Sequence, residues 1–171
     1  MQASVQWAED AGFQLAMLSD HVAITPDVAR AYPEPFYEPF TAIAWLAGQT
    51  STIKLGATVI IVPYRHDLLN ARMTANLDQL SGGRFIVGVG VGWAREEFAA
   101  LGVPFERRGQ LTDAYLRSVK QPHPPIWVGG HSPAAIRRAA RFGDAWHPLN
   151  ARLDWLTEQG LPRLREHAER L

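Results

Sequence analysis

The sequence contains no cysteine, and this absence excludes three kinds of chemistry at once. Without thiols the chain can form no disulfide, no thiolate metal site and no cysteine nucleophile. It also lacks an excess of charge of either sign, because 17 Lys and Arg residues balance 17 Asp and Glu residues. The charge therefore gives no reason to expect a nucleic-acid partner or an anionic membrane surface.

Long hydrophobic runs are missing as well. The longest uncharged apolar stretch, Leu55–Tyr64, is about half the length that a membrane-spanning helix needs. No basic segment followed by an apolar one opens the chain, as it would in a secretory signal. The composition is otherwise that of a globular protein, with 47% hydrophobic and 20% charged residues. We expect a soluble protein of the cytoplasm.

A glycine-rich stretch near the middle of the chain is its most informative feature. Residues 80–93 read Leu-Ser-Gly-Gly-Arg-Phe-Ile-Val-Gly-Val-Gly-Val-Gly-Trp. The apolar run Phe85–Val89 predicts a strand buried on both faces. Gly88, Gly90 and Gly92 leave the end of this strand bare, so that a ligand, a cofactor or a helix can approach it closely. The alternative is that these glycines serve only packing or a turn.

The same glycines do not form a dinucleotide-binding fingerprint. That motif requires the spacing G-x-G-x-x-G at the start of a helix. Here the spacing is G-x-G-x-G, and Trp93 occupies the position of the third glycine. A Rossmann-type cofactor site is therefore disfavoured.

Apolar runs that read as buried strands alternate with helical patterns along the chain. The strands are expected near residues 13–18, 53–62, 85–89, 125–129 and 144–148. Helical spacing separates them, most clearly over residues 66–80, where leucine and methionine recur at intervals of three and four. This alternation predicts an α/β fold with a parallel sheet and right-handed crossovers.

The first predicted strand ends in the ionisable pair Asp20-His21. Parallel α/β proteins keep their sites at the carboxyl edge of the sheet, where this pair is expected to lie. Histidine is also the side chain best suited to proton transfer near neutral pH. The alternative is that Asp20 caps a turn and His21 is a structural donor, and the chemistry alone does not choose between the two.

A second candidate site follows the strand near 125–129. The turn Gly129-Gly130-His131-Ser132 leads into a helix, with Ser132 as a good N-cap and Pro133 at the first helical position. Backbone amides at such a helix start favour an anion. The alternative is an ordinary capped helix.

Two further features limit the interpretation. Residues 22–37 have no periodicity and predict a loop over the mouth of the site, whose aromatic residues line a substrate entrance or simply pack. The histidines show neither mutual spacing nor carboxylate neighbours typical of a metal site, so we expect no bound metal.

Several motifs together resemble one known family. Leu80-Ser-Gly-Gly-Arg84, Gly88-Val-Gly-Val-Gly-Trp93, and Glu96-Glu-Phe98 followed by Leu101-Gly-Val-Pro-Phe105 resemble the luciferase-like monooxygenase family, in the branch that uses coenzyme F420. The resemblance extends from about Trp7 to Leu149. It implies a (β/α)8 TIM barrel that transfers a hydride between the deazaflavin coenzyme and a small organic substrate.

The resemblance also implies roles for individual residues. His21 lies beside the reactive carbon of the coenzyme ring as acid/base partner, and we expect Asp20 to orient it. Thr58 and Val59 support the ring through a non-prolyl cis peptide bond. The resemblance further implies that the edge of the ring and the tail of the cofactor are faced by Gly90, Gly92 and Trp93. The cofactor phosphate is expected at Gly129, Gly130, His131 and Ser132.

The chain departs from the family pattern in two ways. Trp93 stands where the sugar-phosphate dehydrogenases of the family have a glutamate acid, so oxidation of a sugar phosphate is disfavoured. The first strand, a lid insertion near 120/121 and the last two strands are absent. A complete barrel takes about 250 residues. We therefore expect residues 1–171 to form one incomplete barrel domain with about five of eight strands.

Two alternative functions, the substrate and the assembly remain to be tested. An FMN-dependent luciferase-like monooxygenase would use the same scaffold with reduced flavin and oxygen. A degenerate, non-catalytic barrel paralogue would explain the absent strands, although the Asp20-His21 pair speaks against it. The sequence does not choose between reduction of an enone or an imine and reaction of an unknown alcohol substrate. We expect a homodimer that binds a small-molecule substrate, with neither a nucleic-acid nor a membrane partner.

Overall fold

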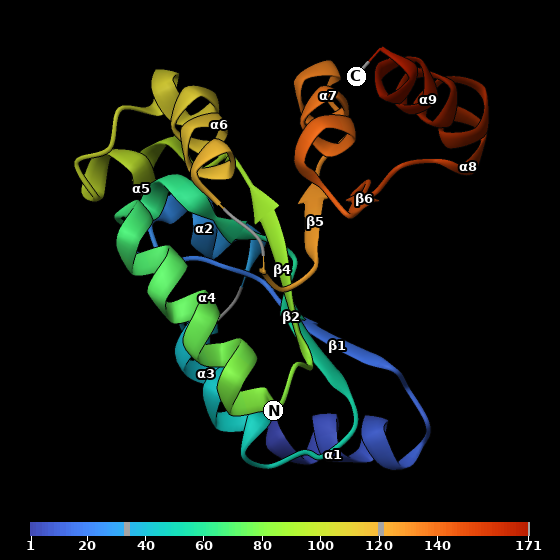
Figure 1. Cartoon of the computed structure of the whole chain (residues 1–171). Coiled ribbons are helices and arrows are strands. Elements are labelled where there is room, and N and C mark those ends of the chain that lie inside the picture. Colours follow the sequence, from blue (N-terminus) through green and yellow to red (C-terminus); the bar gives the residue numbers. More distant parts are fainter. Residues whose placement is uncertain (33–34, 120–121, 171) are drawn as a thin grey trace.

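The computed structural model describes residues 1–32, 35–119 and 122–170. They form one parallel β-sheet with helices packed around it (Figure 1). The strand order is β1-β2-β4-β5-β6, with β3 paired to β4. All the strand pairs are parallel, and Leu18 lies opposite Ala57 while Val89 lies opposite Val128. The strands are β1 (Leu15–Leu18), β2 (Lys54–Ala57), β3 (Ile60–Ile61), β4 (Phe85–Gly90), β5 (Ile126–Gly129) and β6 (Ala145–His147).

The prediction of a single strand over residues 53–62 is wrong in one respect. A cis peptide bond between Thr58 and Val59 separates β2 from β3, as the family resemblance implied. Hydrophobic periodicity carries no sign of such a break, because the residues on both sides of it are apolar. The result is a bulge in the chain at the carboxyl end of β2.

Helices connect the consecutive strands, as the alternation predicted, except for β2 and β3. Their bounds are α1 (Gln2–Asp10), α2 (Pro26–Ala31), α3 (Pro39–Ala47), α4 (Asp67–Ser81), α5 (Arg95–Ala100), α6 (Arg108–Ser118), α7 (Pro133–Phe142), α8 (Leu153–Trp155) and α9 (Leu161–Glu169). Gly82 ends α4 in the left-handed conformation, with a φ of 67°. This is the helix end that a glycine stabilises best.

Residues 22–37 contain a helix that the sequence analysis missed. Pro26 begins α2 at its first position, and the hydroxyl of Thr25 donates to Asp27. The helix has six residues, too few to show an apolar period. Residues 33 and 34 of the predicted loop and the expected lid insertion at 120/121 lie outside the described residues.

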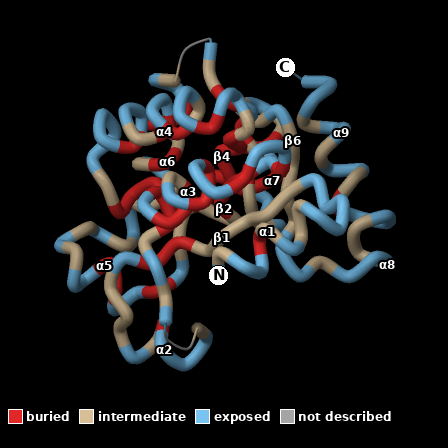
Figure 2. Tube along the Cα trace, turned by 90° about the horizontal axis from the view of Figure 1, so that it is seen from below, coloured by how far each residue is buried: buried red, intermediate tan, exposed pale blue. Residues whose placement is uncertain are grey.

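The hydrophobic core lies between the sheet and its covering helices. Every residue of β4 is buried, and α3 and α4 pack beside β2 and β4. Figure 2 shows the buried segments concentrated around β2 and β4, with the outer surfaces of the helices exposed. Burial on both faces explains why the sequence of β4 is apolar throughout rather than alternating.

The sheet is open within the described part of the chain. There β1 pairs only with β2, and β6 pairs only with β5. An open sheet of this kind agrees with the expected incomplete barrel. Across the described ranges, every helix is too short or too polar to cross a bilayer.

Candidate active site at the carboxyl edge of the sheet

A cavity of about 210 Å³ lies where the parallel strands end. It is lined by residues that follow β1, β2, β4 and β5, so segments far apart in the sequence meet at one edge of the sheet. The sequence-predicted site residues that line it are Asp20, His21, Thr58, Val59, Gly90, Gly92, Trp93, Gly129 and Gly130. The structure does not bring His131 and Ser132 into its lining, although they belong to the adjoining turn.

Glycines of β4 and β5 make room for the bulge at Thr58-Val59. A Cβ atom on Gly90 would lie 2.1 Å from Val59 Cγ2, and one on Gly129 would lie 2.4 Å from Val59 Cγ1. A Cβ atom on Gly88 would lie 1.8 Å from the carbonyl oxygen of Ala57. The bulge therefore packs against the bare end of the strand. Its residues Thr58 and Val59 also form part of the cavity wall.

His21 is held by Glu97, a residue that the sequence analysis quoted in a motif but gave no role. His21 Nδ1 lies 2.6 Å from Glu97 Oε2, and both side chains are buried. A carboxylate can only accept hydrogen bonds, so Nδ1 carries the proton and Nε2 is left with a free lone pair in the neutral ring. His21 is also one of the residues that line the cavity.

The carboxylate of Glu97 is fully buried and accepts four hydrogen bonds. Its Oε1 accepts from the amides of Val22 and Ala23, and its Oε2 accepts from His21 and the hydroxyl of Tyr64. Burial alone would raise the pKa of Glu97, but these donors outweigh it and hold that pKa below its usual range. Burial and the nearby carboxylate raise the pKa of Tyr64, which stays a donor.

The hypothesis that Asp20 orients His21 is wrong. Asp20 forms two hydrogen bonds with Arg65, at 2.7 and 2.8 Å, and accepts the amide of Ile61 at 2.8 Å. Burial raises the pKa of Asp20 even though Arg65 opposes it. Asp20 thereby ties the end of β1 to β3 and to the turn that follows, and supports the cavity wall instead of the imidazole.

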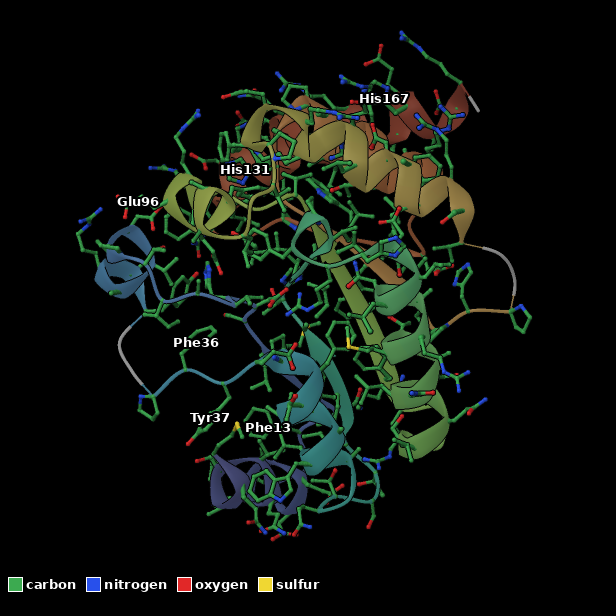
Figure 3. The ribbon with its side chains drawn as sticks, turned by 90° about the vertical axis from the view of Figure 1, so that its left-hand side faces the viewer. Phe13, Phe36, Tyr37, Glu96, His131 and His167 are labelled. Carbon is green, nitrogen blue, oxygen red and sulfur yellow. The ribbon has the colours of Figure 1, made fainter. Side chains whose placement is uncertain are left out.

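Three aromatic rings lie beside His21, and we call them the aromatic rim. The centroids of Tyr32, Phe36 and Trp93 lie 5.0, 5.6 and 5.7 Å from the centroid of the imidazole. In Figure 3, Phe36 lies between α2 and α3, whereas Tyr37 lies farther toward α1. Two of the aromatic residues of the predicted entrance are thus beside His21, and Tyr37 lines a different groove.

The turn after β5 is fastened to β6. The amide of Gly130 donates to the carbonyl of His147 at 3.1 Å, and the hydroxyl of Ser132 accepts the amide of Ala135 at the start of α7. Anion binding at this turn must therefore use other groups than the Gly130 amide. His147 Nε2 also lies 2.9 Å from the hydroxyl of Thr58, and burial lowers the pKa of His147.

Metal-ligating groups do not gather at the cavity. Among residues 1–32, 35–119 and 122–170, no three His, Asp or Glu side chains are placed to hold a metal ion. The functional groups of the site are one oriented imidazole, buried carboxylates and the aromatic rim. Such a site can bind a planar apolar ring and move a proton next to it.

Comparison with known proteins connects this geometry to a family. The model of the family described as luciferase-like monooxygenase matches residues 1–121 and 116–171. An uncharacterized protein of Mycobacterium tuberculosis is 31% identical over 177 aligned positions, which cover 81% of this chain and 61% of that protein. The chain thus spans less than two thirds of the length of this curated relative.

Solved structures share the fold at low sequence identity. An F420-dependent secondary alcohol dehydrogenase in complex with an F420-acetone adduct has a TM-score of 0.83, with 18% identity over 99% of this chain and 59% of that one. The oxygenating constituent of 3,6-diketocamphane monooxygenase from Pseudomonas putida, in complex with FMN, has a TM-score of 0.78, with 20% identity over 99% and 56%.

Proposed function

The chain belongs to the luciferase-like monooxygenase family, and from that premise we propose that it transfers a hydride between coenzyme F420 and a small organic substrate. Members of this family are oxidoreductases and monooxygenases. The observation that carries the proposal is the imidazole of His21, fixed at Nδ1 by Glu97 and facing the cavity beneath the aromatic rim. We further propose that residues 1–171 form one partial barrel domain.

The residues around the cavity fit a flat cofactor ring. Val59 fills the space left by the missing side chains of Gly90 and Gly129, which gives the cavity a smooth apolar wall. The cavity volume of about 210 Å³ is below the usual range of about 300–1,000 Å³ for whole ligands, so it suits one part of a larger molecule. We propose that Thr58, Val59, Gly90, Gly92 and Trp93 hold the ring.

In the proposed mechanism the coenzyme, when it is bound, supplies the hydride donor or acceptor. The protein's own groups orient the substrate and the coenzyme and exclude water. His21 Nε2 takes or returns the proton that balances the hydride at the substrate oxygen or nitrogen. Tyr32, Phe36 and Trp93 exclude water from the imidazole, and Asp20 keeps the end of β1 in place through Arg65. The turn at Gly129, Gly130, His131 and Ser132 is proposed for the coenzyme phosphate.

An FMN-dependent monooxygenase is the second candidate. It is supported by the TM-score of 0.78 to a monooxygenase component that is in complex with FMN. The apolar wall at Val59 suits a flavin as well as a deazaflavin. The sequence motifs around residues 80–105, which resemble the F420-using branch, support F420 as the first choice.

The proposal extends to assembly and location. An apolar groove between α1 and α3 is lined by Met1, Tyr37 and Trp45, and the two aromatic side chains are about half exposed. Apolar patches of this kind mark interaction surfaces, which supports a homodimer. The lack of cysteine is compatible with a cytoplasmic location, where disulfides are rare.

Replacement of His21 tests the proposed acid/base role. In His21→Ala the proton acceptor is lost while the wall at Val59 remains, so turnover of an F420-linked alcohol or carbonyl substrate should fall by about 10²-fold or more. Binding of F420 should change by less than about tenfold. Turnover is followed by the absorbance of the coenzyme, and binding is followed by calorimetry. A variant that turns over at the wild-type rate would refute the role.

A further inference from the structure

A second pocket lies on the outer side of the sheet, away from the candidate active site. Its volume is about 400 Å³, and none of its lining residues lines the cavity at the carboxyl edge. One face of α6, one face of α7 and the end of α9 form its walls, and His167 of α9 is labelled in Figure 3. The lining residues are Gly109, Asp113, Arg117, Ala134, Arg137, Arg138, Arg141, Phe142, His167 and Arg170, and we call this pocket the arginine groove.

Positive charge is concentrated in the arginine groove far beyond the average of the chain. Five of the 17 basic residues line it together with one histidine, and among the described lining residues Asp113 alone is acidic. The molecule as a whole has a formal net charge of zero. Like charges brought together on neighbouring helices repel one another, so an arrangement of this kind is more stable with an anion between them.

Only part of this charge is neutralised inside the protein. Arg138 is buried and pairs with Asp113, a contact that joins α7 to α6, and Arg170 pairs with Glu166. The guanidinium groups of Arg117, Arg137 and Arg141 are exposed and make no hydrogen bond or ion pair with the rest of the described chain. Arg141 lies over the ring of Phe142, with 5.2 Å between the guanidinium carbon and the ring centroid.

The spacing of these arginines places them on helix faces that border the same groove. The α7 positions in the lining, 134, 137, 138 and 141, fall on one face of that helix, while positions 109, 113 and 117 fall on one face of α6. The free guanidinium groups therefore flank the groove from both walls. Guanidinium groups bind phosphate and carboxylate through paired hydrogen bonds, with a geometry that lysine does not offer.

We propose that the arginine groove binds a small polyanion, a molecule with at least two phosphate or carboxylate groups. Its volume of about 400 Å³ falls in the range of about 300–1,000 Å³ that is typical of small-molecule sites. Two anionic groups match the free cations on opposite walls, Arg117 on α6 and the pair Arg137 and Arg141 on α7. The site is independent of hydride transfer and of the cofactor.

The test is isothermal titration calorimetry on the complete chain at low salt, with sodium tripolyphosphate as the phosphate probe and citrate as the carboxylate probe. We expect one binding site per chain for at least one probe, and the tighter probe identifies the ligand chemistry. The double variant Arg137→Gln/Arg141→Gln should weaken that binding by at least about tenfold, because two charge-assisted contacts are lost. The matched control is Arg30→Gln/Arg72→Gln, which removes two exposed arginines outside the groove and should change binding by less than about twofold.

The proposal fails if neither probe binds, or if the control variant loses as much affinity as the groove variant. Circular dichroism melts check that each variant is folded. If the α7 variant melts below the wild type, Arg117→Gln on the opposite wall repeats the test, because this exposed side chain belongs to α6. Unchanged binding in that variant would also overturn the proposal.

Discussion

At the scale of single residues, the site is built on the buried pair of His21 and Glu97, whose Nδ1 and Oε2 atoms lie 2.6 Å apart. The Asp20-His21 motif was visible because both residues follow an apolar strand, and the structure places both at the cavity. Glu97 is 76 residues away from His21 and adjoins a second glutamate in the sequence. Only the orientation of α5 in space decides that Glu97 points inward and Glu96 outward. The partner of His21 was therefore assigned to the wrong carboxylate.

The replacement of Glu97 by glutamine tests this pairing. Turned toward Val22 and Ala23, the NH₂ group of the amide faces two backbone donors. Turned toward His21 and Tyr64, it can donate only if the imidazole changes its tautomer and the hydroxyl rotates, and the hydroxyl then loses its acceptor. We expect Glu97→Gln to lower the free energy of unfolding by about 2–4 kcal/mol at pH 7, because buried donors lose their acceptor. Denaturant titration measures this loss. Glu96→Gln is the matched control, since Glu96 is exposed and should change stability by less than about 0.5 kcal/mol.

The same variant predicts a pH dependence with a definite sign. Because the pKa of Glu97 is lowered in the folded protein from the ordinary value of 4.5, the ionised carboxylate stabilises the fold fully above pH 4.5. This contribution is lost as the pH falls through the folded pKa. The stability gap between the wild type and Glu97→Gln should therefore be widest near neutral pH and narrow below pH 4.5. A gap of constant size across that range would contradict the pairing.

At the scale of elements, the strands and long helices were predictable and the interruptions were not. Helix α4 has 15 residues, enough to show its apolar period, whereas α2 has only six and was taken for a loop. The break between β2 and β3 occurs within continuous apolar sequence, so only the family resemblance pointed to it. The glycines were recognised as sites of close approach, but the approaching group, the bulge with Val59, is a product of tertiary structure.

Gly88 tests the packing of β4 against the end of β2. In Gly88→Ala the new methyl carbon would lie 1.8 Å from the carbonyl oxygen of Ala57, and this backbone atom cannot move without shifting the bulge. We expect a loss of about 3 kcal/mol or more in unfolding free energy, as for severe overpacking. The control is Gly48→Ala, where the nearest atom would be 3.5 Å away and φ is −77°. Equal thermal midpoints for the two variants would show that the strands do not approach so closely.

At the scale of the whole molecule, the parallel order of the strands brings the site residues together at one edge of the sheet. The strand ends that carry His21, Thr58, Gly90 and Gly129 meet at one edge because β1, β2, β4 and β5 are neighbours in the sheet. Alternating strands and helices in the sequence were enough to predict this parallel arrangement. The arginine groove was not predictable in the same way, because its charges come from three helices whose sequences each look like ordinary solvated surface.

The central claim is that the cavity at the carboxyl edge holds a deazaflavin ring. The most direct test is parallel calorimetric titration of the complete, folded chain with F420 and with FMN. We expect saturable one-to-one binding of F420 that is tighter than binding of FMN. Binding of FMN alone would contradict the choice of F420 and favour the monooxygenase. A folded chain that binds neither cofactor would contradict the claim itself and support a non-catalytic barrel.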